Sequence, residues 1–171
     1  MRNMFIGIVV GVLIAAAGLS FTTSAASDAE QQTKDRAEIE ALMWRYVRTL
    51  DGYDPDGYAA LYTTDGQFIA GANATKGRDA LKKMIADFKQ RRVEQEAKGQ
   101  KAAPSYHMSM NEHLEFVDRD HARLNAYWLT VFGAEGQSTP LRVAAAGRSI
   151  DELVRVNGKW LIKTRNVAPQ N

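Results

Sequence analysis

The stretch Ile39–Asp51 reads IEALMWRYVRTLD. Its apolar residues recur at spacings of three and four, which places them on one helix face. They are Ile39, Leu42, Met43, Tyr46, Val47 and Leu50. Asp51 lies four residues beyond Val47 and continues this face. Because a buried aspartate nearly always has a partner, Asp51 should either reach solvent at a helix end or meet a partner inside a cavity.

The residues after this stretch leave two interpretations of Asp51 open. Asp51–Gly52 and Asp54–Pro55 are both turn-forming pairs, and aspartate side chains in turns hydrogen-bond to nearby backbone. A turn residue is therefore one interpretation, and a carboxylate in a pocket is the other. Periodicity alone favours the turn.

The first 26 residues are typical of a secretory signal peptide. Arg2 gives a basic start, Met4–Leu19 is an apolar run, and Ser24–Ala26 supplies small residues for cleavage. We expect cleavage near Ala26 and a single domain over residues 27–171 that is periplasmic or secreted, with no stable membrane association. Since the run is rather short for a membrane span, a retained anchor is the less favoured alternative.

Composition excludes several classes of function. The chain has no cysteine, so it has no disulfide, thiolate chemistry or lipoprotein acylation site. Its net charge is only +2, which gives no nucleic-acid footprint, so we expect no nucleic-acid partner. The three histidines, His107, His113 and His121, lack the short spacing of zinc ligands. No glycine loop for phosphates is present either, so the sequence predicts no metal and no cofactor.

Hydrophobic period and turn residues predict helices first and long strands later. The expected helices are Ser27–Thr49, Tyr58–Tyr62 and one that starts near Gly77 and ends in the solvated segment Lys89–Lys101. The expected strands are Gln67–Ala70, the hairpin Ser105–Val117 with Ala122–Phe132, and the hairpin Ile150–Val156 with Lys159–Val167. Gly133–Pro140 is the predicted loop, and Asn157–Gly158 is a type I′ turn. This order indicates an α+β fold.

Two strand residues are candidates for a site. Alternation groups His107 with Ser109, Asn111, His113 and Glu115 on one face of its strand, either an outer solvated face or the lining of a cavity. One β-bulge would shift this phase. An imidazole titrates nearest neutrality and can act as a general base.

Arg165 alternates with Leu161, Lys163 and Val167 in the last strand. It is either an exposed strand arginine or a guanidinium that stabilises an anion in a pocket. The run Val143–Gly147 consists of small residues, which leave room on the sheet for a ligand or for a packed helix.

The order of these segments resembles the SnoaL-like branch of the nuclear transport factor 2-like superfamily. The resemblance extends from about Asp35 to Val167. It is carried by RYVRTLD at 45–51 with Asp54, YTTDG at 62–66 with Phe68, and LVRVNGKW at 153–160. It implies a cone-shaped, cystatin-like fold, in which a curved antiparallel sheet wraps around three helices and encloses an apolar pocket. It also implies a possible homodimer through the open face of the sheet.

Members such as scytalone dehydratase and hexachlorocyclohexane dehydrochlorinase pair an aspartate at the end of the first helix with a strand histidine that removes a proton from the substrate. Asp51 and His107 match these two residues by position. Arg165 matches an arginine of the dehydrochlorinase, whereas Tyr46 stands where that enzyme has a basic residue. The implied substrate-binding residues are Tyr46, Tyr62, Phe68, Asn111, Trp128 and Gly147.

Together, the residues and the resemblance predict an exported, cofactor-independent lyase or isomerase. Its His107–Asp51 dyad would abstract a proton from a small hydrophobic substrate, and Arg165 would stabilise negative charge on an enolate or leaving group. The alternative is a non-catalytic protein that holds an apolar small molecule in the same pocket.

Overall fold

The computed structural model describes residues 10–100, 103–133 and 141–169, with side chains from residue 27 onward. The chain divides into two compact units, residues 1–38 and 39–171. The first unit is helical where it is described. The second unit contains the sheet, the core and the candidate site.

Helix α1 spans Val10–Asp51, so it begins well before the expected Ser27 and ends two residues after the expected Thr49. The apolar run contains no proline and includes the three consecutive alanines Ala15–Ala17, which favour a helix. Among the described helices, none is long and apolar enough to cross a membrane. The signal peptide over residues 1–26 stays a prediction, and its residues 1–9 lie outside the described part of the chain.

Helix α2 spans Pro55–Ala60 and starts earlier than predicted because Asp54 caps it. The Asp54 carboxylate accepts a 3.0 Å hydrogen bond from the Gly57 N–H, and a proline occupies the first turn. Helix α3 spans Arg78–Ala97. It therefore continues through much of the predicted solvated segment, whose residues are mostly exposed on this helix.

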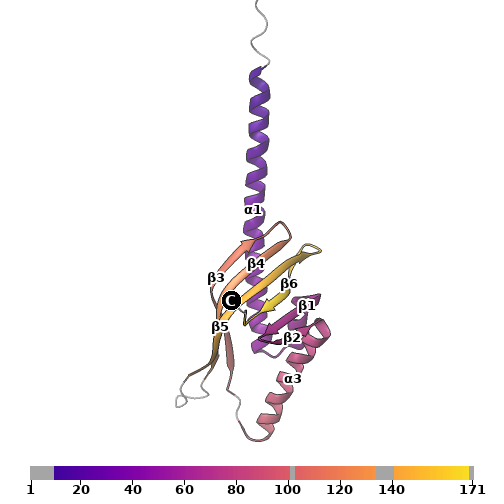
Figure 1. Cartoon of the computed structure of the whole chain (residues 1–171), viewed down its shortest axis with the longest axis vertical. Coiled ribbons are helices and arrows are strands. Elements are labelled where there is room, and N and C mark those ends of the chain that lie inside the picture. Colours follow the sequence, from indigo (N-terminus) through magenta and orange to yellow (C-terminus); the bar gives the residue numbers. More distant parts are fainter. Residues whose placement is uncertain (1–9, 101–102, 134–140, 170–171) are drawn as a thin grey trace, which may run out of the picture. The chain divides into compact units, whose positions relative to one another are not determined.

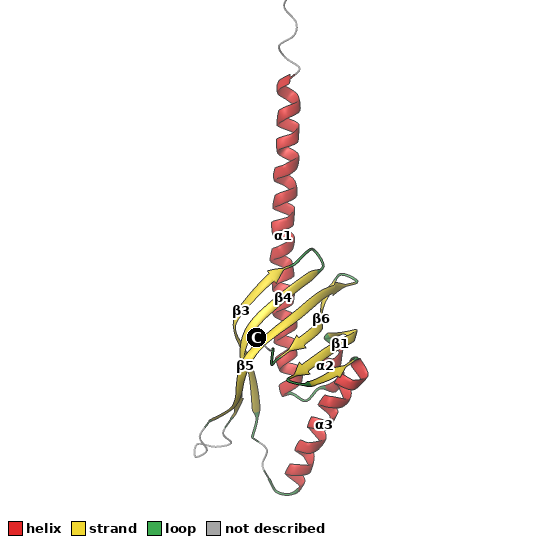
Figure 2. Ribbon diagram, in the orientation of Figure 1, coloured by secondary structure: helices red, strands yellow, loops and turns green. Residues whose placement is uncertain are grey.

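The described residues form one sheet of six strands, ordered β2-β1-β6-β5-β4-β3. Neighbouring strands are antiparallel except for the parallel pair β1 and β6. The strands are β1 Tyr62–Ala70, β2 Asn73–Lys76, β3 Ser105–Phe116, β4 His121–Phe132, β5 Arg142–Val156 and β6 Lys159–Asn166. Figures 1 and 2 show that the sheet is strongly curved and that α3 lies beside β1 and β2. The predicted α+β fold, a curved sheet with three helices, is confirmed.

Both predicted hairpins are confirmed as β3–β4 and β5–β6. Asn157 and Gly158 have φ angles of 50° and 76°, as a type I′ turn requires. Strand β2 was not predicted, and β5 begins eight residues before the predicted start at Ile150. Of the predicted loop Gly133–Pro140, residues 134–140 lie outside the described residues.

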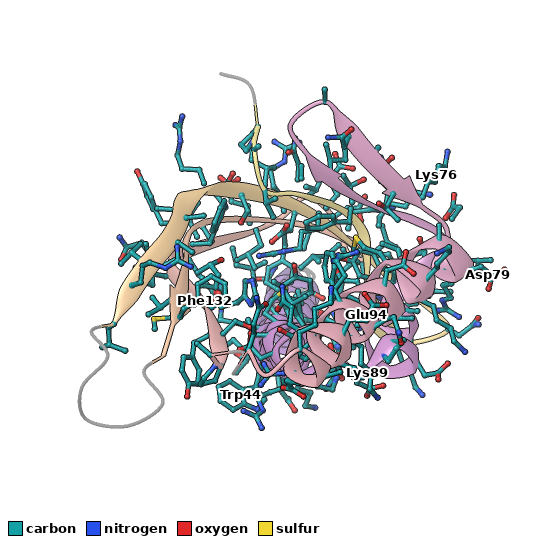
Figure 3. The ribbon with its side chains drawn as sticks, turned by 90° about the horizontal axis from the view of Figure 1, so that it is seen from below. Trp44, Lys76, Asp79, Lys89, Glu94 and Phe132 are labelled. Carbon is teal, nitrogen blue, oxygen red and sulfur yellow. The ribbon has the colours of Figure 1, made fainter. Side chains whose placement is uncertain are left out.

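The apolar stripe of α1 forms part of the core of the second unit. Ile39, Leu42, Met43 and Tyr46 are each at most 4% exposed and pack in one cluster with residues of α2, α3 and the sheet. Trp44 lies on the opposite helix face and is 66% exposed (Figure 3). The helical period therefore identified the buried face of α1 correctly.

A β-bulge divides β3 into two halves. The register with β4 shifts between Met110 and His113, and Asn111 has a φ of 51°. Before the bulge, His107 and Ser109 face the interior, whereas after it Leu114 and Phe116 pack against the core. The predicted grouping of His107 and Ser109 with His113 and Glu115 on one face is therefore wrong, since the last two side chains are 71% and 53% exposed.

A second irregularity divides β6. Leu153 pairs with Ile162 and the neighbouring Glu152 pairs with Thr164, so Lys163 is an extra residue on β6. Ile162 and Arg165 are therefore both buried, although strict alternation would put them on opposite faces. The prediction that Arg165 shares a face with Lys163 is wrong, since the Lys163 side chain is 41% exposed.

Candidate active site

The last residue of α1 contacts a histidine of β3. The His107 Nδ1 lies 2.6 Å from Asp51 Oδ1, and the two side chains are 30% and 17% exposed respectively. Asp51 therefore ends its helix and also has a partner in the interior. The hydrogen bonds of its carboxylate go to His107 on β3, and not to nearby backbone as the turn interpretation expected.

Asp51 also binds the backbone of β3. The His107 N–H donates to both carboxylate oxygens of Asp51, each at 3.2 Å. This contact fixes the strand against the helix end, so the carboxylate holds both the main chain and the imidazole of His107. Both the backbone and the imidazole of His107 are therefore held in place by Asp51.

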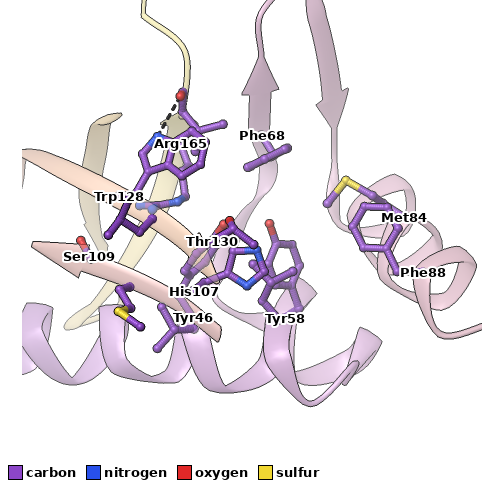
Figure 4. A pocket seen from close by; sticks show the side chains of 15 residues that line it. Tyr46, Tyr58, Phe68, Met84, Phe88, His107, Ser109, Trp128, Thr130 and Arg165 are labelled. Carbon is purple, nitrogen blue, oxygen red and sulfur yellow. Dashed lines mark hydrogen bonds between the residues drawn. The ribbon is translucent and has the colours of Figure 1, made fainter. Parts of the chain in front are cut away.

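His107 lines a mostly apolar cavity of about 240 Å³ between the helices and the curved sheet (Figure 4). The volume exceeds that of a cavity of about 150 Å³ that holds benzene, so a molecule of one or two rings fits. Three of the six predicted binding residues line this cavity, namely Tyr46, Phe68 and Trp128. Arg165 lines it as well.

Arg165 is 3% exposed and forms a buried ion pair with Asp151, the residue opposite it on β5. Its guanidinium carbon lies 4.2 Å from the centre of the Tyr46 ring. Burial disfavours the charge of Arg165, but the Asp151 carboxylate together with Tyr46 and Tyr62 outweighs this effect, so the pKa of Arg165 is raised. Nε of Arg165 has no hydrogen-bond partner among the described residues, so it can still donate.

The burial of Asp151 raises the pKa of its carboxyl from 3.8 to about 6, even though the positive charge of Arg165 acts in the opposite direction. One of its oxygens, Oδ1, has no partner among the described residues. This carboxylate is therefore kept charged by Arg165 at some cost in stability.

Three tyrosines pack against one another at the cavity with their rings tilted by 45° and 42°. The ring of Tyr58 lies 5.4 Å from that of Tyr46 and 5.3 Å from that of Tyr62, and the Tyr58 and Tyr62 hydroxyls are 2.9 Å apart. Burial raises the pKa of Tyr58 and of Tyr62, so both phenols stay protonated. Tyr58 lines the cavity, whereas Tyr62 lies behind it and has no exposed surface.

Residues 31–166 match the family model of the SnoaL-like domain. The chain belongs to the SnoaL-like domain family. Solved structures share its fold. Rv3472 of Mycobacterium tuberculosis, a protein of unknown function, is 22% identical, with a TM-score of 0.68 over 84% of this chain and 76% of that chain.

Two proteins of Novosphingobium aromaticivorans are also similar to this SnoaL-like domain. A candidate scytalone dehydratase is 25% identical, with a TM-score of 0.62 over 81% of this chain and 85% of that chain. A nuclear transport factor 2-like protein with a cystatin-like fold is 21% identical, with a TM-score of 0.68 over 87% and 90% of the two chains. The comparison with curated proteins finds no match.

Gly147 shapes the cavity of this SnoaL-like domain without lining it. Gly147 pairs with Trp128 across β4 and β5, and a Cβ at this position would lie 2.7 Å from the indole ring. The indole N–H donates to the carbonyl groups of Arg148 and Val167 at 3.1 and 2.9 Å. The space left by this small residue therefore accommodates the Trp128 side chain, rather than a ligand directly.

Asn111 lies away from the cavity. It is exposed at the bulge of β3 and borders a separate shallow hollow with His113. His113 pairs with Glu115, and His121 pairs with Asp118. In the described ranges, no three His, Asp or Glu side chains gather as metal ligands would.

Other residues of the lining were not predicted. They include Tyr58, Met84, Phe88 and Thr130. The apolar period of α3 contained Met84 and Phe88, but it could not distinguish a cavity wall from a core. Thr130 pairs with His107 across the β3–β4 ladder, so the register of that hairpin could have identified it.

Proposed function

We propose that this SnoaL-like domain is a cofactor-independent lyase or isomerase that removes a proton from carbon in a small hydrophobic substrate. The observation that carries the proposal is the 2.6 Å contact between Asp51 and His107 at the wall of an apolar cavity. His107 is the general base, and Asp51 is its positioning residue.

The dyad fixes which imidazole nitrogen is the base. A charged carboxylate can only accept, so Nδ1 of His107 carries the proton that it donates to Asp51. The lone pair is then on Nε2. When Nε2 accepts a substrate proton, the Asp51 carboxylate stabilises the imidazolium.

The electrons of the broken carbon–hydrogen bond move to an adjacent carbonyl oxygen and form an enolate. Arg165 is part of the cavity wall, and its guanidinium supplies a positive charge that would stabilise such an oxygen. Return of the proton to another carbon would complete an isomerisation. Departure of a leaving group with its electron pair, followed by transfer of the Nε2 proton to that group or to water, would complete an elimination. The similar candidate scytalone dehydratase supports the elimination.

Deuterium exchange tests the proton abstraction without knowledge of the natural substrate. In D₂O, the protein should speed the incorporation of deuterium next to the carbonyl of small aromatic ketones such as 2-tetralone. Proton NMR measures this rate. The rate should fall on acidification, because a protonated imidazole has no lone pair. A rate that does not change with pH would contradict a histidine base.

A non-catalytic binding protein would give a different result in the same experiment. The ketones would change the fluorescence of Trp128, which lines the cavity, but no deuterium would enter them. That outcome would replace the enzyme proposal by the binding alternative. Binding without exchange across a panel of ketones of different acidity would be decisive.

We also propose that the domain acts outside the cytoplasm, on the basis of the N-terminal sequence pattern. The protein recovered from the periplasm or medium should have a mass that corresponds to cleavage near Ala26. An uncleaved mass in the membrane fraction would instead indicate a retained anchor. The homodimer that the family resemblance implies stays a prediction.

A further inference from the structure

A second and larger hollow, of about 850 Å³, adjoins the inner cavity. The two share four wall residues, which are Leu50, Phe88, His107 and Thr130. His107 therefore lies at the junction between them. A ligand that reacts at His107 can extend past this residue into the outer hollow.

Three arginines line the outer hollow, two from α3 and one from β5. The guanidinium carbon of each lies over an aromatic ring: Arg91 over Phe88 at 4.8 Å, Arg92 over Tyr53 at 5.5 Å, and Arg142 over Phe132 at 4.7 Å. Stacking orients a guanidinium while leaving N–H donors in its plane available.

The charge of these arginines is only partly balanced. Arg92 forms a 3.0 Å ion pair with Glu96, whereas Arg91 and Arg142 have no carboxylate partner among the described residues. No Asp or Glu is among the described residues that line the hollow. The inner cavity differs, because Arg165, the one arginine among the described residues that line it, is paired with Asp151.

Arg91 lies on α3 and Arg142 is the first residue of β5, so two separate elements supply cations to the hollow. In Figure 3, the labels Phe132, at the end of β4, and Glu94, on α3, help to locate the end of the sheet and the helix. Two planar cations on separate elements can bind one anion from two directions. The apolar inner wall and the cationic outer wall together match an amphipathic molecule.

We propose that the outer hollow binds an anionic group, a carboxylate or a phosphate, on a ligand whose apolar part occupies the inner cavity. Arg91 and Arg142 are the anion-binding residues. The inference rests on the proposed function for the inner cavity and adds the substrate class, an apolar acid or an apolar group on a phosphate-bearing carrier.

A pair of unreactive probes tests this assignment by binding alone. 2-Naphthylacetate and 2-naphthylacetamide have the same apolar body and differ in charge. Calorimetric titration should show that the acid binds about 5- to 20-fold more tightly at low salt. High salt should reduce this preference, since the arginines are near the surface. 2-Naphthyl phosphate, as a third probe, distinguishes a carboxylate site from a phosphate site.

The double variant Arg91→Gln/Arg142→Gln should lose the preference for the anionic probes and keep its affinity for the amide. Arg45→Gln is the matched control, because Arg45 is an exposed arginine on α1 that lines neither space. Equal affinity of the wild type for acid and amide would overturn the proposal, as would a preference that survives the double variant. Failure of every probe to bind would overturn it too. A protein that shows the preference but exchanges no deuterium keeps this site and loses the proposed reaction.

Discussion

Replacement of His107 by alanine is expected to lower the rate of proton abstraction by about 100- to 10,000-fold, the usual contribution of a positioned general base. The cavity and Arg165 would remain, so binding of an apolar ligand should change much less than kcat. The measurement is deuterium exchange or steady-state turnover on the same ketone for both proteins, with ligand affinity determined in parallel.

Asp51→Asn separates the two contacts that Asp51 makes. The amide oxygen can still accept from the His107 N–H, so β3 should stay fixed to the end of α1. The negative charge that stabilises the imidazolium is lost, and the rate should therefore fall while the unfolding temperature changes little. Asp51→Ala removes both contacts and should lower the rate and the unfolding temperature together.

His113→Ala is the matched control for the loss of an imidazole. His113 lies on the same strand, but its side chain is 71% exposed and it does not line the inner cavity. Its removal should leave the exchange rate unchanged. Equal rates for the wild type, His107→Ala and Asp51→Asn would reject the dyad as the base.

The helical half of the site was the more predictable half from sequence. The period of α1 put Asp51 on the buried face, because a helix keeps its period as long as its backbone is regular, although periodicity alone favoured a turn residue over a carboxylate in a pocket. The structure places Asp51 on the same side as the buried stripe, next to His107. The stripe alone could not name the partner, which lies 56 residues further along the chain.

The strand half of the site was less predictable, because both strands that carry it are irregular. An extra residue reverses the faces of every residue that follows it. The bulge near Asn111 lets His107 and Phe116 face the same interior, and the extra Lys163 turns Arg165 inward. Neither irregularity has a distinctive local sequence, so alternation gave the wrong face for Arg165.

Contacts between strands were also beyond the reach of local patterns. Gly147 looked like space for a ligand, but its partner in the ladder is Trp128, and the indole takes that space. Asp151 was not singled out at all. Its pairing with Arg165 depends on the β5–β6 register. The type I′ turn sets this register only as far as Lys163, the extra residue on β6, so the turn alone did not predict the pair.

The buried ion pair of Arg165 and Asp151 should have a large effect on stability. Replacement of Arg165 by methionine is expected to destabilise the fold by about 3–5 kcal/mol at neutral pH, because it leaves Asp151 buried without a cation. Asp151 has no exposed surface. Arg45→Met is the control, since removal of an exposed arginine should change the free energy of unfolding by less than about 0.5 kcal/mol. Denaturant unfolding measures both.

The raised pKa of Asp151 determines how the stability of the fold changes with pH. In the folded protein the pKa of Asp151 is raised to about 6, above its ordinary value of 3.8. The folded state therefore binds the carboxyl proton of Asp151 more tightly than the unfolded state does. The stability that protonation of Asp151 provides is lost as the pH rises from about 4 through 6. In Arg165→Met nothing opposes desolvation, so the pKa rises further and the loss continues to higher pH.

The double variant Arg165→Met/Asp151→Leu should recover most of the stability lost in Arg165→Met and should lose its pH dependence. An apolar pair of similar size needs no desolvation of charge, and such replacements of buried ion pairs are often neutral or stabilising. If the variant then folds as stably as the wild type but exchanges deuterium more slowly, Arg165 is present for the chemistry of the cavity and not for the fold. If Arg165→Met alone is as stable as the wild type at every pH, the charge of Asp151 does not depend on Arg165, and the ion pair does not have the role derived above.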